Sequence, residues 1–418
     1  MVAKRLSQSL VLRKRITKSA ALCLFSCLFL CFAQRTLAEE SEKPVEEESR
    51  AHVGYGKKGF EFGSADGNYL MQIQSRFQFR YTYRIIENGV DYRDYQSVGQ
   101  NTFRVNRARL KIGGHAYRPW IMYFFEYELV GSALLDYRFM IEKLPYLSFK
   151  AGQWKVYYNR ERVISSGSQQ MLDRSMINPY FTVDRQQGVS LYGRLDGRGA
   201  ADFNYWVSVF SGTGRGANEN DDAYPMLMAR IQWNVLGREL EFSGSDLTFH
   251  KRGAGILALA AVTNQSPYTK FSQNGGGELW GFEPGEPGQY RVNQWVEETA
   301  LMFRGFSWQQ EFHWKQVHDR VNGSTTTMIG NYVQFGYFFH YAWSAIPKPL
   351  ELAFRHSFYY PDLNQTADRQ YEYSLAANWF FHAHLNKLTA QVTYMEFRNT
   401  ATGLQEDLWI ALQWDISI

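Results

Sequence analysis

Apolar and polar side chains alternate along residues 69–85, YLMQIQSRFQFRYTYRI. A repeat of two residues is typical of a β-strand, whose successive side chains point to opposite faces of the sheet. One face of this strand is apolar and rich in aromatics, and the other carries Arg76, Arg80 and Arg84. A soluble sheet buries its apolar face in a core, whereas a transmembrane barrel turns that face to lipid and lines an aqueous lumen with the polar face.

The same alternation recurs along the chain and predicts sixteen strands. They cover residues 69–85, 102–112, 123–129, 135–141, 147–151, 189–194, 203–209, 227–235, 256–263, 292–304, 306–315, 333–339, 350–358, 371–379, 388–394 and 408–418, with the strand at 292–304 the most irregular. Connections after even-numbered strands are mostly short. The long ones, at 86–101, 153–187, 212–223 and 264–290, follow odd-numbered strands. This asymmetry predicts an all-β fold: a transmembrane antiparallel β-barrel of about 16 strands around an aqueous channel, with both termini in the periplasm.

The composition agrees with a barrel. Aromatic residues make up 17% of the chain although the mean hydropathy is only −0.41, as alternating strands require. Beyond residue 38 no apolar run reaches the roughly 18 residues of a spanning helix. A soluble β-sandwich or β-helix is the alternative, but it needs buried partners for the aromatic face of nearly every strand and does not explain the asymmetry of the loops.

The first 38 residues are typical of a secretory signal peptide. Basic residues without any acid precede an apolar run at 20–33, which is too short to span a membrane, and Ala38 supplies the small residue for cleavage. Retention as an anchor is the alternative. We expect an acidic, flexible periplasmic arm at 39–60 and the barrel at 61–418. All three cysteines lie in the signal, so the mature chain forms no disulfide.

Removal of the signal changes the net charge. It carries seven of the 45 Lys and Arg residues and none of the 41 Asp and Glu residues, which leaves 38 basic against 41 acidic groups. The mature chain is therefore not a basic nucleic-acid binder overall. Arg outnumbers Lys in it by 26 to 12, so the positions of the arginines matter more than the net charge.

Two adjacent predicted strands place cations on their polar faces. Arg76, Arg80 and Arg84 recur about 13 Å apart on the first strand, and Arg107, Arg109 and Lys111 about 7 Å apart on the second, at ~3.3 Å per residue. The guanidinium fork suits phosphate oxygens, and a row of weak sites lets an anion pass from one to the next. The alternative is an ordinary polar lumen. Acidic residues on the next strands would then balance the arginines, as in a general porin: Glu126, Glu128, Asp136 and Glu142.

The segment 147–195 carries the cues of a known family. It has a short strand ending in Gly152-Gln153, then Arg160-Glu161-Arg162, Asp173-Arg174-Ser175, and Asp184-Arg185 before Gly188-Val189, and residues 103–110 form the arginine-rich FRVNRARL. In these features the chain resembles the phosphate-selective porins O and P of Gram-negative outer membranes, over residues 60–418. The resemblance implies a 16-stranded, trimeric channel whose third outer loop folds into the pore, with an arginine ladder leading to a basic constriction.

The long connection at 153–187 is the third outer loop by this count, and a connection of that length in a compact barrel is usually functional. Its candidate constriction residues are Lys155, Arg160, Arg162, Arg174 and Arg185, although the interleaved Glu161, Asp173 and Asp184 are potential partners for them. Replacing Arg160 and Arg162 by Glu is accordingly expected to lower anion selectivity.

The function we expect is passive diffusion of small anions, phosphate or polyphosphate-like solutes, through the outer membrane of a Gram-negative bacterium. No cofactor or metal is expected. The nine histidines are scattered without a metal-binding spacing, and no glycine-rich phosphate loop or catalytic constellation is found, so we do not expect an enzyme. The expected partners are membrane lipid, small anions and two further copies of the chain, and no nucleic acid. A weakly selective general porin and a plugged structural or adhesive barrel are the alternatives.

Overall fold

The structure is a computed structural model that describes residues 51–56, 58–87, 101–217, 219–273, 275–401 and 403–418. The predicted signal peptide and most of the predicted acidic arm lie outside the described residues, and so does most of the connection at 86–101. Among the described residues, no helix is both long enough and apolar enough to cross a membrane.

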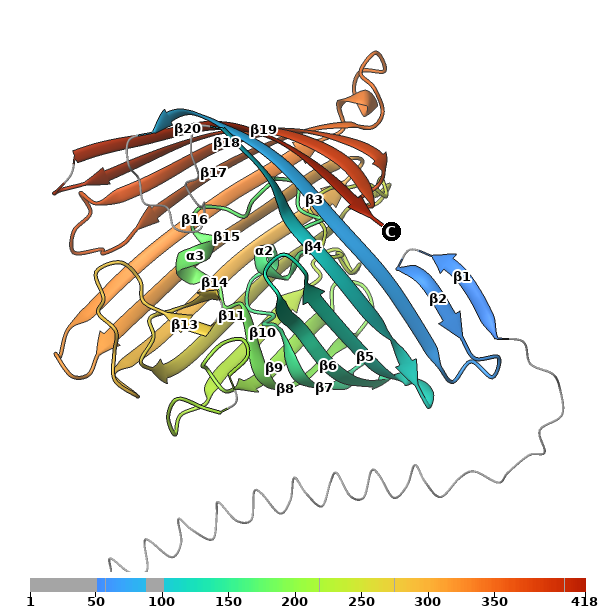
Figure 1. The fold of residues 1–418 in the computed structure, drawn as a ribbon, viewed down its shortest axis with the longest axis horizontal. Helices are drawn as coiled ribbons and strands as arrows, with labels where there is room; N and C mark the ends of the chain where they lie inside the picture. Colours follow the sequence, from blue (N-terminus) through green and yellow to red (C-terminus); the bar gives the residue numbers. More distant parts are fainter. Residues whose placement is uncertain (1–50, 57, 88–100, 218, 274, 402) are drawn as a thin grey trace, which may run out of the picture. The chain divides into compact units, whose positions relative to one another are not determined.

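Sixteen antiparallel strands close into a barrel (Figure 1). They are β3 (Leu70–Glu87), β4 (Asn101–Ala116), β5 (Arg118–Glu128), β6 (Ala133–Leu144), β7 (Leu147–Lys155), β8 (Arg185–Asp196), β9 (Asp202–Phe210), β10 (Met226–Trp233), β11 (Ala254–Ser266), β14 (Tyr290–Phe303), β15 (Phe306–Asp319), β16 (Thr325–Tyr337), β17 (Leu350–Tyr360), β18 (Arg369–His382), β19 (Asn386–Asn399) and β20 (Gly403–Ser417). Each strand pairs with its neighbours in sequence, and β20 pairs with β3 to close the ring. The predicted fold class and number of barrel strands are confirmed.

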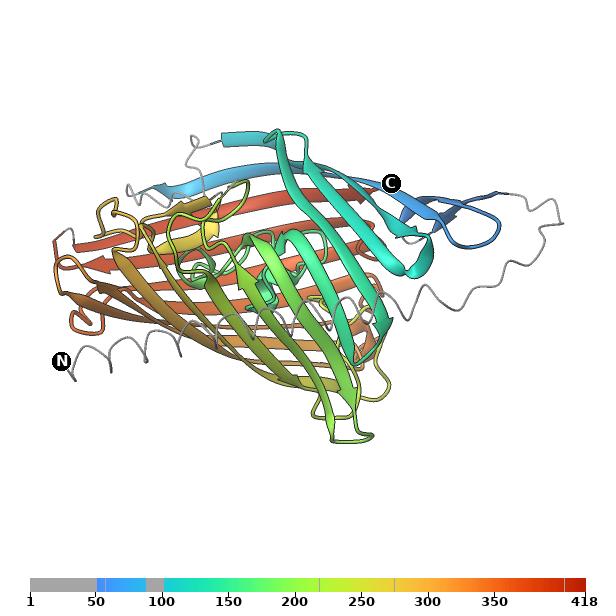
Figure 2. The ribbon, with the colours of Figure 1, turned by 90° about the horizontal axis from the view of Figure 1, so that it is seen from below.

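Alternating exposure distinguishes the two faces of each strand. On β3 the side chains of Arg76, Arg80 and Arg84 are buried on the inner side, whereas Tyr81 and Tyr83 are exposed on the outside. The strand at 292–304, which the sequence pattern left irregular, is the regular strand β14, in which buried and partly exposed residues alternate throughout. The inner side of the barrel is buried because loops enter the lumen and pack against it (Figure 2).

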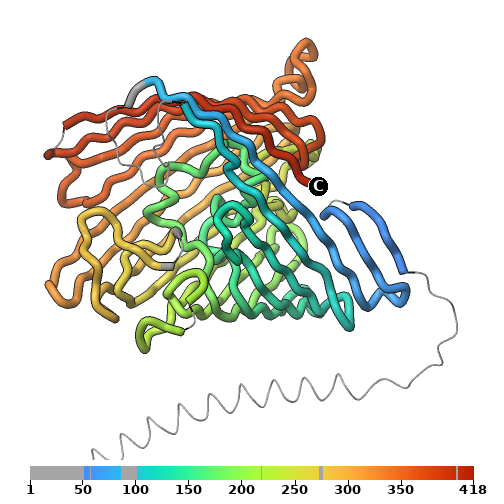
Figure 3. The backbone as a smooth tube through the Cα atoms, in the orientation of Figure 1, coloured from blue at the N-terminus to red at the C-terminus, as the bar shows by residue number. Residues whose placement is uncertain are grey.

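A hairpin precedes the barrel and was missed by the sequence pattern. Its strands are β1 (His52–Gly56) and β2 (Gly59–Gly63), so β1 and the start of β2 lie in the stretch that was expected to be a flexible arm. β2 pairs with the first residues of β3, from Leu70 to Ile73. The C-terminal Ile418 takes over as the neighbour of β3 at Ser75, through backbone hydrogen bonds of 2.7 and 2.8 Å (Figure 3).

One inner connection departs from the short turns expected at that end of the barrel. Residues 234–253, between β10 and β11, bury Leu240, Ser243, Ser245 and Asp246. Ser245 donates to Glu351 of β17 at 2.8 Å, and Gly244 N donates to the Ser168 carbonyl at 2.9 Å. This segment, called the inner plug below, therefore packs inside the barrel rather than beneath it.

A β-bulge at Asn106 sets the facing of the arginines on β4. Gln78 pairs with Arg107 and Phe79 pairs with Val105, so Asn106 has no partner on β3. A bulge adds one residue to one strand and reverses the parity beyond it. Arg104 before the bulge and Arg107 after it consequently share the inner face, although they are three residues apart.

Deletion of Asn106 is expected to impair barrel assembly. Without the extra residue, either Arg104 or the set from Arg107 onward must turn to the apolar outer face. Such an arginine costs about 2–4 kcal/mol at the middle of a membrane and less near its surfaces. We expect the deletion to reduce the heat-modifiable, compact band on cold SDS gels. Asn106→Ala keeps the residue count and serves as the control; normal assembly of the deletion variant would contradict this role of the bulge.

Candidate functional site

The connection between β7 and β8, residues 156–184, folds inside the barrel and is called the third loop below (Figures 1 and 2). It contains two single-turn helices, α2 (Arg160–Val163) and α3 (Asn178–Phe181). The loop is shorter than the expected 153–187, because Lys155 and Arg185 pair with each other as strand residues of β7 and β8. A short hairpin from the loop at 267–289, β12 (Lys270–Gln273) and β13 (Gly275–Gly277), packs on α3.

Carboxylates of the barrel wall hold the backbone of the third loop. Glu298 of β14, Glu311 of β15 and Glu372 of β18 are buried and face the lumen. They accept hydrogen bonds from loop amides, from Arg160 N to Glu298 at 2.9 Å, from Glu161 N to Glu311 at 2.6 Å and from Met176 N to Glu372 at 2.8 Å. Amide bonds to an ionised acceptor are about twice as strong as neutral ones, so these three fix the course of the loop.

Two wall arginines pair with two of these three carboxylates, and His313 contacts the third, Glu311, at 3.0 Å. Arg230 of β10 forms an ion pair with Glu298 and also donates to the Tyr158 carbonyl at 3.1 Å. Arg355 of β17 forms an ion pair with Glu372 and donates to the Asp173 carbonyl at 2.9 Å. The sequence pattern did not single out any of these residues, because the sequence does not show which inward-facing polar residues of the wall contact the loop.

Two residues of the predicted ladder also hold the third loop. Arg80 forms an ion pair with Asp173 at 2.6 Å, and Arg76 donates to Ser165 at 2.9 Å. Burial alone would raise the pKa of Asp173, but the Arg80 guanidinium outweighs it and lowers that pKa from 3.8 to about 2. Asp173 is therefore ionised at neutral pH, and the ion pair ties the loop to β3.

The opposite side of the third loop faces a cluster of cations. Arg104, Arg107, Arg109 and Lys111 project from β4, Arg162 and Arg174 from the loop, and Lys155 and Arg185 from β7 and β8. Burial first, and then repulsion from Arg162 and Arg107, lowers the pKa of Arg174. Arg109 and Arg185 both contact Glu126, and Arg162 and Arg185 both contact Asp184, so the structure brings predicted site residues of β4, of the loop and of β8 together.

Some of these cations have carboxylate partners. Arg109 contacts Glu128 at 2.7 Å and Glu126 at 3.0 Å; Arg185 contacts Asp136 at 2.5 Å and Glu126 at 3.4 Å; Arg162 pairs with Asp184. Within the described ranges, Arg104, Arg107 and Lys111 contact no carboxylate; Arg107 donates to the neutral Gln78 at 2.8 Å. The pairs and the three unpaired cations together give this side of the third loop an excess of positive charge.

Two predicted residues lie away from this cluster. Arg84 pairs with Asp407 at 3.3 Å near the outer end of β3. Arg160 is buried against the inner plug, where it donates to the Glu241 carbonyl and lies over the Phe242 ring at 5.1 Å. The expected charge reversal at Arg160 would consequently disturb the contact of the third loop with the plug as well as the charge of the pore.

A pH prediction follows from the pair of Arg80 and Asp173. Because the folded state holds the pKa of Asp173 at about 2, its carboxylate stabilises the loop above about pH 4, and this contribution disappears as the pH falls from 4 towards 2. We expect brief closures of single channels to become more frequent over this range. Asp173→Asn should show such closures already at pH 7, whereas Asp362→Asn, in an outer loop, should not. A quiet Asp173→Asn channel would contradict the anchoring role.

Structures of similar fold are outer-membrane channels. OmpT of Vibrio cholerae matches with a TM-score of 0.55 and 8% identity over 84% of this chain and 98% of that chain. An anion-selective porin from Comamonas acidovorans matches with a TM-score of 0.56 and 8% identity over 83% and 99%. The outer membrane channel DcaP of Acinetobacter baumannii matches with a TM-score of 0.52 and 12% identity over 84% and 98%. At these identities the likeness establishes the fold alone.

No curated protein matches the sequence. Within the described part of the chain, no group of three His, Asp or Glu residues is placed to hold a metal ion. The family model of phosphate-selective porin O and P matches residues 77–409, which is most of the barrel. The chain belongs to this porin family and is an outer-membrane porin.

Proposed function

We propose that the channel passes small anions by passive diffusion and favours phosphate-like ones. The observation that carries this proposal is the row of cations on β4. Arg104 lies opposite Arg80, Arg107 opposite Gln78, Arg109 opposite Arg76 and Lys111 opposite Gln74, so the row descends from the outer end of the barrel towards the inner end. An anion that enters from outside meets a cation at each step.

The mechanism is the exchange of hydration for contacts with arginine and lysine. Where the third loop narrows the lumen, an anion sheds part of its water and binds guanidinium groups, whose fork matches phosphate oxygens. Each cation has another cation next to it in the row, so the anion is attracted to the next site while it leaves the first and is not held at a single one. The chain contributes no bond-making step, so we propose a channel without catalytic activity.

Export and cleavage belong to the same proposal. The precursor would be secreted with its signal peptide and cleaved after Ala38, and the mature chain would then reach the outer membrane. One structure of similar fold is described as an anion-selective porin, and we extend that preference to this chain because of its own cation row. The rival function is a general porin, which the pairs of Arg109 and Arg185 with carboxylates favour, since paired charges do not select.

We also propose a homotrimer, in line with the family. The outer face of β14 and β15 is polar at mid-height: Gln310 donates to Glu297 at 3.3 Å, Thr299 donates to Gln310 at 3.0 Å, and Trp308 donates to Thr299 at 3.2 Å. Glu297 is at the centre of β14. A charged side chain that faces lipid at that depth costs about 2–4 kcal/mol in stability, and a carboxylate is at the lower end of this range. A protein neighbour that supplies polar partners removes this cost.

The selectivity proposal predicts the behaviour of Arg107→Gln/Lys111→Gln. At about 6 Å in water one fixed positive charge stabilises an anion by roughly 0.7 kcal/mol and destabilises a cation by the same amount, so each loss should lower the anion-to-cation permeability ratio about tenfold. The measurement is the reversal potential of single channels in a KCl gradient, repeated with added phosphate. Lys143→Gln, at an exposed position on β6, is the matched control. A wild-type channel without anion preference, or unchanged potentials in the double variant, would favour the general porin.

The trimer proposal is tested by Glu297→Leu, because this change has opposite effects on stability at a lipid-facing surface and at a subunit interface. If this carboxylate faced lipid, Glu297→Leu would stabilise the protein by removing a buried charge. At a subunit interface the same change removes polar contacts, and the temperature at which the trimer dissociates on semi-native gels should fall. A higher dissociation temperature, or a monomeric wild type in gentle detergent, would reject this interface.

A further inference from the structure

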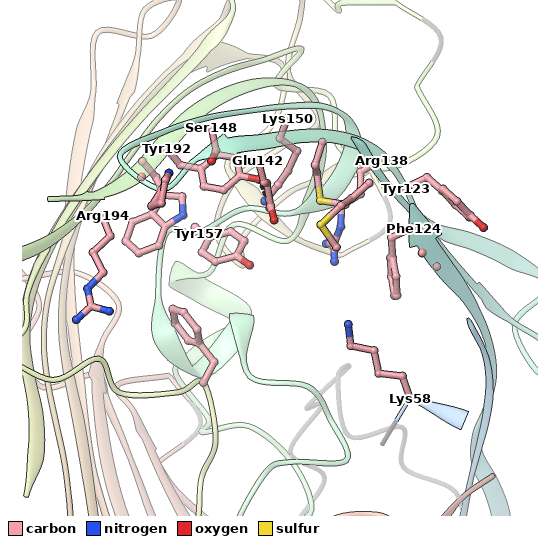
Figure 4. A pocket seen from close by; sticks show the side chains of 18 of the residues that line it. Lys58, Tyr123, Phe124, Arg138, Glu142, Ser148, Lys150, Tyr157, Tyr192 and Arg194 are labelled. Carbon is pink, nitrogen blue, oxygen red and sulfur yellow. Dashed lines mark hydrogen bonds between the residues drawn. The ribbon is translucent and has the colours of Figure 1, made fainter. Parts of the chain in front are cut away.

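A second candidate site lies in the inner half of the lumen, away from the constriction. A cavity of ≈ 820 Å³ is lined by the inner parts of β3 to β9, by Lys58 in the β1–β2 turn, by Tyr157 of the third loop and by Phe242 of the inner plug. Figure 4 shows Lys150 on one side of this space and Lys58 reaching into it from the other. An anion that has crossed the constriction would meet this cavity next, because Lys111 at the inner end of the β4 row also lines it.

Lys150 is held in this cavity by aromatic rings. Lys150 is only 4% exposed. Its ammonium lies 4.5 Å from the ring centre of Tyr192, 4.6 Å from that of Tyr157 and 5.5 Å from that of Trp154. In the described part of the chain no carboxylate or other hydrogen-bond acceptor contacts it, and the nearby Glu142 accepts instead from the Tyr192 hydroxyl at 2.5 Å. An ammonium has three N–H donors, and a cation–π contact does not give them a hydrogen-bond acceptor. Lys150 therefore has ring contacts but no anionic partner.

The walls beside Lys150 suit a flat apolar group. Tyr157 stacks on Trp206 at 5.4 Å with 19° between the rings, and Phe242 meets Tyr157 edge-on at 5.7 Å. Met122, Met140 and Phe124 complete the apolar lining. Aromatic and thioether surfaces favour a ring in offset or edge-on contact.

We propose that this cavity binds small aromatic carboxylates, with the carboxylate on Lys150 and the ring among Tyr157, Trp206 and Phe242. The inference rests on the proposed function, since it names a class of anion that the channel would pass. Inorganic phosphate lacks the apolar body that these walls fit. A sugar phosphate also satisfies Lys150, but the rings beside it give the sugar hydroxyls no hydrogen-bond partner; other lining residues such as Gln72, Gln74 and Asn204 would have to supply one.

Calorimetric titration of the purified porin in detergent with benzoate tests this site, with acetate and glucose 6-phosphate as comparison ligands. We expect benzoate to bind about tenfold more tightly than either. Lys150→Gln should weaken benzoate binding about tenfold, and Tyr157→Leu, which keeps the charge, should weaken it to a similar extent. Lys143→Gln, outside the cavity, should leave it unchanged, and heat-modifiability on gels verifies that each variant folds.

Equal binding of benzoate and acetate, or unchanged binding in both folded variants, would overturn the proposal. Tighter binding of glucose 6-phosphate would also overturn it and point to sugar phosphates. The test is separate from that of the proposed function, because calorimetry does not depend on conduction. An anion-selective channel that does not bind benzoate disproves only this site, whereas a benzoate-binding channel without anion preference disproves only the proposed function.

Discussion

A loop that is buried inside a barrel must find partners for backbone groups that water does not reach, and the charged hydrogen bonds between the third loop and the wall meet this requirement. Glu298, Glu311 and Glu372 accept from loop amides, and Arg355 donates to a loop carbonyl. Buried carboxylates are costly unless they are paired, so the wall must also carry Arg230 and Arg355. The position of the constriction depends on this network, because the loop has no regular structure beyond two single turns.

The network divides the barrel into two sides. From β14 through β20 to β3, inward side chains are used to hold the loop, and even the arginines at 76 and 80 serve this purpose. From β4 to β9 they border the remaining passage and the inner cavity. On the side that holds the loop, charged side chains are neutralised by ion pairs. On the side from β4 to β9, the unpaired cations are the ones that would act on a passing anion. The anion selectivity that we propose therefore rests mainly on β4 and on the loop residues that face it.

The sequence was sufficient for the barrel but only partly for the site. Strict alternation located β3 and β20, because one of their faces is apolar and the other polar. A bulge leaves no mark in the sequence except that the alternation shifts by one residue. Arg107 was therefore predicted to lie in the row of cations, and Arg104, on the other side of the bulge, was missed. The inner plug and the wall carboxylates were missed because their partners are remote in sequence: Glu311, for example, meets Glu161, 150 positions away. A polar residue at an inward position looks the same whether it faces water or a loop.

The irregular pattern of β14 has a physical cause that connects the two faces of the wall. Inside, Val292 and Val296 are apolar because the third loop and its neighbours cover them in one buried cluster. Outside, Asn293, Glu297 and Thr299 are polar at positions where other strands carry aromatics or leucine. This strand inverts the usual arrangement of a barrel in lipid, and each inversion requires protein where water or lipid would otherwise lie. The loop supplies that protein on the inside, and the trimer that we propose would supply it on the outside.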